Sequence, residues 1–465
     1  MTALIAHDWW RARTLGRPRW ELVLLAAILA IAAAARIVWI IYVTRRPQEL
    51  NDPLFYIFFG EQISLGNGYR LLDGSPTAYY PVGYPAALGA IFALVRHTPI
   101  PDNFTFAATS FQAFLGVATV LFAYEVGRRL FSPAVGLVSG LWIAVFPNLV
   151  FHTGAFLSET LFNFLIMASL LVLFAGPWRE RRLTPLTLVA FGLVLGVSAL
   201  VRPISLLFLP LLAIVWLLAG FGWRRAFGYT GAIALTAVAV IAPWSIRNFA
   251  VMDAPVIIST NLGDDLCMGH HPGAPGRFVL PDFCFGGYEQ YARPEYEVRR
   301  HDENIEKAVR YAVRHPLREI ELIYLKARWT YNHDHDAVWA AESYSNDPFI
   351  GHVLRSRLNR LADGFFFLTL IVGAPGVAAL ALSNEPRRRF LLLAMLALGL
   401  VPLAFFGDPR FHVPAMPLLS IAAAWATVAA GRVAWSRVER LRAANAGGRA
   451  SGAVEVAEGE GAVSE

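Results

Sequence analysis

Ten long apolar runs constrain what this chain can fold into more than any other feature of its sequence. Each is about as long as the 17–25 residues that a helix needs to cross a bilayer. With 56% hydrophobic and 16% charged residues over 465 positions, the chain has more apolar side chains than a soluble surface can hide. The sequence therefore predicts an all-α, multi-pass membrane protein. The runs lie at 21–43, 104–124, 133–151, 157–176, 185–201, 203–221, 226–246, 361–383, 390–406 and 413–431.

The distribution of arginine predicts which way these spans point. The net charge is +6, and all basic residues except Lys307 and Lys326 are arginines. Cytoplasmic loops of membrane proteins are enriched in basic residues. If the N-terminus is cytoplasmic and the shorter run at 84–95 lies along the membrane as an interfacial helix, nineteen arginines fall on the inner side. They occupy the N-terminal segment, the loops at 128–129, 179–182, 224–225 and 387–389, and the C-terminal tail.

This orientation predicts how the chain is organised. A small α-rich domain on the outer side follows from the polar segment 250–360, in which 303–324 is predicted to be helical. The tail is rich in Gly, Ala and Glu from about residue 443 and is predicted to be largely disordered. The predicted parts are a cytoplasmic N-terminus (1–20), a transmembrane module (21–249) with a first outer loop (44–103), the outer domain (250–360), C-terminal transmembrane helices (361–431) and a cytoplasmic tail (432–465).

Two carboxylates stand at the outer ends of predicted spans. Asp52 follows the first span among apolar and aromatic residues, where burial would raise its pKa toward that of a general base. The alternative is that Asp52 caps the helix that begins at Pro53. Glu159 opens the fourth span, where it either complements the helix dipole or positions reacting groups beside Asp52. The pair could also hold a divalent metal ion, although its spacing is not a specific metal signal.

Four cations are predicted on the same outer side: Arg202, Arg247, Lys326 and Arg410. Single arginines at span ends commonly anchor in the headgroup region. Several beside an aspartate suit an anionic lipid headgroup, because the planar guanidinium binds phosphate through two parallel hydrogen bonds.

Other familiar chemistries are not indicated. The chain has no Walker-type phosphate loop, no zinc-spaced Cys/His set and no Gly-x-Ser-x-Gly elbow. It also lacks an aromatic-rich basic patch, so nucleic acid is not a predicted partner. Cys267 and Cys284 both fall in the outer domain, where they form either a disulfide or two free thiols.

Short motifs follow one another in order from about residue 41 to residue 422. They are Asp52 with Tyr56, Gly66-Asn67-Gly68-Tyr69, the segment 80–85, Ser158-Glu159, Val201-Arg202-Pro203, the segment 243–248, the segments 259–263 and 269–276, and Arg410-Phe411. Together they resemble the bacterial branch of the protein O-mannosyltransferase and aminoarabinose-transferase superfamily, which is of the glycosyltransferase-39 type. The resemblance implies a GT-C fold in the bacterial cytoplasmic membrane.

The resemblance also implies a reaction. A hexosyl or pentosyl group would pass from a polyprenyl-phosphate donor to an acceptor hydroxyl on the outer side, with inversion; the acceptor is a protein, a lipid or a polysaccharide. Asp52 matches the family's base, Glu159 would position it, and the four cations would hold the donor phosphate. Further substrate-binding residues would be Tyr56, Tyr84, Asn261, His270 and His412.

The chain departs from the family pattern in two places. Pro53 follows Asp52 where many relatives have Glu, which puts a metal bridged by that pair in doubt. His270 and His271 stand where relatives often have Asn. A transporter or flippase of lipid-linked sugars is the alternative function. Transporters carry charges within their spans, and apart from Arg36 these spans hold almost none.

Overall fold

A computed structural model describes residues 13–14, 16–98, 103–175, 178, 183–286 and 294–460, with side chains described from 16 to 440 in these ranges. The described residues are largely helical, with one small ribbon of β1 (Arg13–Thr14) paired antiparallel with β2 (Arg17–Pro18). Most of the predicted N-terminal segment 1–20 and the arginine loop at 179–182 lie outside the described residues.

Five helical segments are long and apolar enough to cross a membrane. They are α2 (Arg19–Val43), α5 (Phe104–Leu130), α11 (Trp223–Met252), α17 (His352–Ala381) and the stretch Pro409–Arg440, which contains the start of α19 (Met416–Glu460). The chain is therefore a multi-pass membrane protein. The predicted domain boundaries at 249/250 and 360/361 fall inside α11 and α17.

One further apolar segment would be a sixth span and is broken into two pieces. α6 (Pro133–Ala144) meets α7 (Pro147–Phe151) and η1 (His152–Gly154) at an angle of 61°, and the segment is called here the α6–α7 crossing. Pro147 causes the break, because proline disfavours a helical conformation at the residue before it, and Phe146 is extended. This segment therefore turns sharply within the bundle.

The other predicted spans form shorter helices. α8, for example, has 15 residues and is about 22 Å long, less than the ~30 Å of a hydrocarbon core. Ten crossings thus stay a prediction, while five or six meet the length requirement. The shorter elements are α8 (Glu159–Leu173), α9 (Pro185–Val201), η3 (Pro203–Leu207) with α10 (Phe208–Leu218), and α18 (Pro386–Leu400) with η5 (Val401–Ala404).

The basic segments at 128–129 and 387–389 lie near the start of α2, whereas Asp52 follows the end of α2. At the start of α2, the carboxylate of Glu21 accepts a hydrogen bond from Arg128 at 2.8 Å. Arg388 donates to the carbonyl of Leu130 at the same end. Asp52 lies beyond the other end of α2, where α3 (Asp52–Ser64) packs closely on α4 (Gly83–Arg96).

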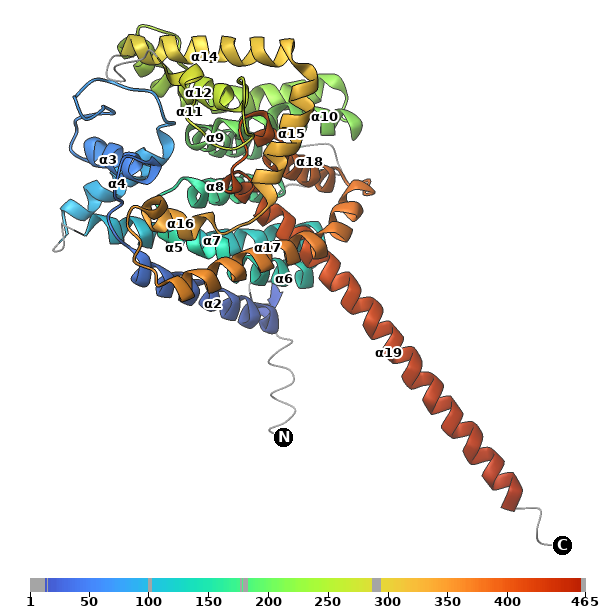
Figure 1. The fold of residues 1–465 in the computed structure, drawn as a ribbon. Coiled ribbons are helices and arrows are strands. Elements are labelled where there is room, and N and C mark those ends of the chain that lie inside the picture. Colours follow the sequence, from blue (N-terminus) through green and yellow to red (C-terminus); the bar gives the residue numbers. More distant parts are fainter. Residues whose placement is uncertain are drawn as a thin grey trace.

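The described part of the polar segment 250–360, the predicted outer domain and called the outer domain below, is built mainly from helices. Figure 1 shows α14 across the side of the helical body opposite α2. The prediction that 303–324 is helical is confirmed except at His315, where α14 ends and α15 begins, because Pro316 cannot continue the first helix. The elements are α12 (Asn261–Gly269), α13 (Asp282–Phe285), α14 (Pro294–Arg314), α15 (Pro316–Tyr331) and α16 (Asp336–Ala341).

The C-terminal tail differs from its prediction. α19 continues to Glu460, through residues for which composition predicts disorder, and it projects from the body of the molecule as one helix (Figure 1). Ala, Glu and Arg favour helix, and a helix that continues from a packed segment needs no new nucleation.

Candidate functional site

Asp52 is the first residue of α3 and faces other side chains. The capping role belongs to Asn51, whose side chain accepts a hydrogen bond from the Leu54 amide, so the alternative reading of Asp52 as the cap is wrong. The Asp52 carboxylate accepts a hydrogen bond from the Tyr80 hydroxyl at 2.7 Å and lies 2.7 Å from Arg410. About a quarter of its side chain (24%) is exposed, so a ligand can reach it.

Arg410 connects several elements. It lies in η6 (Pro409–Phe411), ahead of α19. Its Nη2 pairs with Asp52, its Nη1 donates to the Tyr344 hydroxyl at 3.2 Å, and its Nε lies 3.7 Å from Glu159. Asp408 accepts a hydrogen bond from the Arg410 amide at 3.0 Å and so holds the turn in shape. One guanidinium therefore spans both predicted catalytic carboxylates.

Glu159 is the buried member of the site. It begins α8, has no exposed surface, and pairs with Arg202. Arg202 follows the end of α9 and also donates from Nε to the Ser158 hydroxyl at 2.9 Å. Four charged residues thus form a continuous chain, defined here as the charged chain: Asp52, Arg410, Glu159 and Arg202.

The charged chain is suited to binding an anion. Two carboxylates balance two guanidinium groups, so both cations are neutralised when no ligand is present. A phosphate can compete with a carboxylate for the same N–H donors, because each presents two oxygens that accept parallel hydrogen bonds from a guanidinium group. Arg410 and Asp52 are both partly exposed, so this exchange is possible at that pair.

Further carboxylates surround the charged chain and were not predicted. Burial raises the pKa of Asp265, in α12, to about 7, and the charges of Asp264 and Asp52 add to this effect. Burial likewise raises the pKa of Asp336 and of Asp408, which repel one another. The sequence signal for Asp265 is only an ordinary acidic pair, so its proximity to Asp52 depends on the tertiary structure.

Replacing Asp265 by Asn should change stability in a pH-dependent way. The folded pKa is about 7 against an ordinary value of 3.8, so the folded protein prefers the protonated acid and loses stability as pH rises from about 4 to 7. Asn mimics the protonated acid. We expect the variant to be more stable than the parent by about 1–3 kcal/mol at pH 8 and nearly equal at pH 4. Thermal unfolding of both proteins between pH 4 and pH 8 measures this difference in stability. A stability difference that does not change with pH would contradict the raised pKa of Asp265.

The outer domain holds the segment that positions Asp52. Glu297 of α14 accepts hydrogen bonds from the Thr77 hydroxyl and the Ala78 amide. The Tyr79 hydroxyl donates to Asp264 of α12 at 2.9 Å. The next residue, Tyr80, donates to Asp52, and burial together with that carboxylate raises the pKa of Tyr80, so it stays protonated as a donor.

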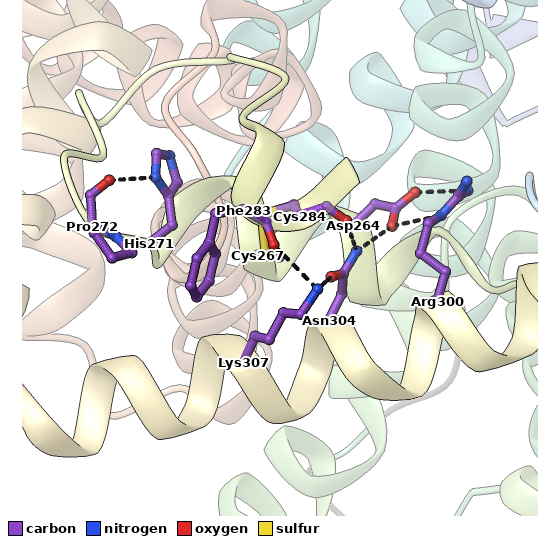
Figure 2. Close-up of a disulfide and its surroundings, with 9 residues drawn as sticks. All are labelled: Asp264, Cys267, His271, Pro272, Phe283, Cys284, Arg300, Asn304 and Lys307. Atoms are coloured by element: carbon purple, nitrogen blue, oxygen red, sulfur yellow. Dashed lines mark hydrogen bonds and ion pairs between the residues drawn. A yellow bond between two sulfur atoms is a disulfide. The ribbon is translucent and has the colours of Figure 1, made fainter. Parts of the chain in front are cut away.

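A disulfide joins α12 to α13. Cys267 and Cys284 are bonded to each other, and Figure 2 shows Asp264 beside them, held by Arg300 and Asn304 of α14. The disulfide thus stabilises the helix that carries Asp264 and Asp265.

Removing this disulfide should destabilise the outer domain. The bond closes a loop between residues 17 positions apart, for which the loss of unfolded-state entropy is worth about 3 kcal/mol. We expect a lower Tm for the Cys267→Ser, Cys284→Ser double variant. A reductant should lower the Tm of the parent but not of the variant; an equal response of both proteins would show that the bond contributes no stability.

Two predicted phosphate-binding cations lie in other surroundings. Arg247 donates to the backbone carbonyls of Tyr69 at 2.6 Å and Thr77 at 2.7 Å, and so supports the first outer loop. Lys326 is fully buried in α15, 3.0 Å from His270 Nε2, and burial lowers its pKa to about 8. The structure brings neither cation into the charged chain.

Some of the predicted substrate-binding residues lie beside the charged chain, and others lie elsewhere. Tyr56 packs edge-on against Tyr80, and Asn261 donates to Asp265 at 2.8 Å, so both border the site. His270 belongs with Lys326, where its Nδ1 lies 2.8 Å from Glu319.

Tyr84 and His412 are core residues. The Tyr84 hydroxyl donates to Gln112 at 3.1 Å. His412 is fully buried, with its ring nitrogens 2.7 Å from the Thr330 carbonyl and 2.8 Å from Asp334. These contacts give both residues a structural role, which a motif in the sequence does not distinguish from a binding role.

Among the residues that the structure describes, no group of three or more His, Cys, Asp or Glu side chains has a geometry that could hold a metal ion. The sequence left open whether Asp52 and Glu159 hold a divalent metal ion, and no metal is assigned to them.

Solved structures share this fold. No protein-family model and no curated protein matches the chain. The chain matches the oligosaccharyltransferase of Archaeoglobus fulgidus in its apo form with a TM-score of 0.54 and 15% identity, over 92% of this chain and 52% of that one. The same enzyme, AglB, in complex with an inhibitory peptide and a dolichol-phosphate, matches with a TM-score of 0.53 and 14% identity, over 90% of this chain and 51% of that one. The chain has a GT-C fold.

The GT-C fold confirms the fold that the family resemblance implied. The chain spans about half the length of the archaeal oligosaccharyltransferase. ArnT from Cupriavidus metallidurans bound to undecaprenyl phosphate is a looser match, with a TM-score of 0.40 and 14% identity over 88% of this chain and 78% of that one.

Proposed function

We propose that the chain is a membrane glycosyltransferase that moves a sugar from a polyprenyl-phosphate donor to an acceptor hydroxyl, with inversion. It would act on the extracytoplasmic face of a bacterial cytoplasmic membrane. The observation that carries this proposal is the pair of Asp52 and Arg410, a partly exposed carboxylate and guanidinium 2.7 Å apart in a GT-C fold. Dolichol-phosphate, a polyprenyl phosphate, is bound in one of the matching archaeal structures.

Arg410 and Arg202 would hold the donor phosphate. A phosphate leaving group is a weak base, so its departure needs cationic stabilisation more than a general acid. Glu159 would keep the two guanidinium groups apart and oriented, because it pairs with Arg202 and lies near Arg410. Arg247 and Lys326, which were predicted for the same role, have other partners.

Asp52 would act as the base once the donor is bound. In the structure one oxygen of its carboxylate is occupied by the ion pair with Arg410. A donor phosphate that takes over the Arg410 N–H groups would release one carboxylate oxygen of Asp52, while the Tyr80 hydroxyl holds the other. The acceptor hydroxyl would then transfer its proton to Asp52 as it attacks the anomeric carbon, and the sugar–phosphate bond would break with the electron pair going to phosphate.

Comparison of envelope glycans tests the proposal. Cells that lack the protein should lack one hexose or pentose on an envelope protein, lipid or polysaccharide, and the wild-type chain should restore it. The purified protein in vesicles should then transfer that sugar from a polyprenyl-phosphate donor supplied on the same side as the acceptor. Movement of the donor between leaflets without transfer would instead support the transporter alternative.

A further inference from the structure

Arg36 is a buried cation inside the first span that the proposed function does not use. Only 1% of it is exposed. Its Nη1 donates to the carbonyls of Ala32 and Ala144, and its Nη2 donates to the carbonyl of Ile143. Ile143 and Ala144 end α6, where helix carbonyls lack partners within the helix. Arg36 thus caps the break in the α6–α7 crossing, where unsatisfied carbonyls would be costly in a bilayer.

The first span also holds the second half of this crossing. One turn after Arg36, the Trp39 indole donates to the carbonyl of Phe151 at 2.8 Å, at the end of α7. α2 therefore supplies side-chain donors to the C-terminal ends of both pieces. These contacts place the Arg36 guanidinium against the segment that leads to Glu159.

A small cavity of about 10 Å³ lies beside Arg36. Several polar atoms of its lining are buried and have no hydrogen-bond partner among the described residues: Arg36 Nε, Thr160 Oγ1, Asn163 Oδ1 and both ring nitrogens of His152. Each of these four residues is at most 5% exposed. Because buried polar groups are nearly always hydrogen-bonded, four such side chains around one space indicate a bound ligand.

The size and chemistry of the cavity select the ligand. A volume of about 10 Å³ is close to the minimum that one water molecule needs. The Arg36 charge already faces the negative end of the α6 dipole, so a neutral ligand suffices. Arg36 Nε is a donor, Asn163 Oδ1 is an acceptor, and Thr160 and a neutral His152 offer both functions. Buried waters make about three hydrogen bonds to partners of this kind.

We propose that this cavity is a binding site for a single water molecule. It would accept a hydrogen bond from Arg36 and donate one to Asn163, with Thr160 and His152 as its other partners. Thr160 directly follows Glu159, and His152 lies on the turn before it. The water would thus connect the first span to the segment that carries Glu159, as a positioning element. This inference stands independently of the proposed function.

Two matched threonine variants test the site. Thr160→Val removes the hydroxyl that faces the water and keeps the side-chain shape. Thr119→Val makes the same change in the same lining, but the Thr119 hydroxyl already donates to the Leu115 carbonyl of its own helix at 2.8 Å. We expect Thr160→Val to lower the Tm by roughly 2–4 °C and Thr119→Val to change it much less. Equal shifts for both variants would overturn the proposal.

A density map of the wild-type protein at a resolution that shows ordered water gives a second, direct readout. One peak should lie about 2.7–3.2 Å from both Arg36 Nε and Asn163 Oδ1. An empty cavity, in a map that shows other buried waters, would overturn the water site even if the Thr160→Val variant fails to fold. Neither readout depends on sugar transfer, so a failed transferase assay leaves this test unaffected.

Discussion

The Asp52→Asn variant should lose sugar transfer and keep its fold. Asn has the same shape and can still accept the hydrogen bond from Tyr80, but it cannot take up the acceptor proton. General-base catalysis typically contributes 10²–10⁴-fold, so we expect a fall in kcat of that order with intact expression and a Tm within a few degrees of the parent. Transfer measured with a polyprenyl-phosphate sugar in vesicles gives the rate.

The control for this variant is Asp73→Asn. Asp73 lies in the same outer loop, and its carboxylate accepts hydrogen bonds only from the neighbouring Ser75 among the contacts described. It should retain parental activity. Donor binding should also survive in Asp52→Asn, because Arg410 is then free of its carboxylate partner. Activity within tenfold of the parent would rule out Asp52 as the base.

Arg410→Gln should weaken both donor binding and the folded state. Removal of one group that stabilises transition-state charge typically costs 10²–10³-fold in kcat. The variant also leaves Asp52 without its cation, removes the positive charge beside Asp408, and leaves Glu159 paired with Arg202 alone. Breaking a fully buried ion pair costs 3–5 kcal/mol, but Arg410 and Asp52 are 18% and 24% exposed, so we expect a loss of about 1–3 kcal/mol.

Arg46→Gln is the matched control, because Arg46 also pairs with a carboxylate, Glu61, but is 61% exposed. Such surface pairs contribute little, so its stability and donor affinity should equal those of the parent. Arg410→Lys should recover stability better than activity, since lysine keeps the charge and loses the planar fork. If the Arg410→Gln variant binds the donor as tightly as the parent does, Arg410 is not part of the phosphate site.

The sequence anticipated some members of the site more readily than others. Asp52, Glu159, Arg202 and Arg410 were predicted, because each lies at the predicted outer end of an apolar run and in a motif of the resembling family. Asp265 was missed, because nothing in its neighbourhood of the sequence shows that α12 packs beside Asp52. Arg247 and His412 were also predicted as site residues, yet one supports a loop and the other packs in the core.

The apolar runs and the placement of arginine by themselves determined that this is a helical membrane protein, and they predicted which end carries the chemistry. Hydrophobicity and charge are properties of the individual residues, so their pattern along the chain can be assessed without knowledge of any tertiary contact. The pairing of charges was decided only by the tertiary structure. Arg410 meets Asp52 across 358 positions, and the broken α6–α7 crossing brings Arg36 beside the segment that leads to Glu159. Such contacts depend on how distant helices pack, a property that no local pattern contains.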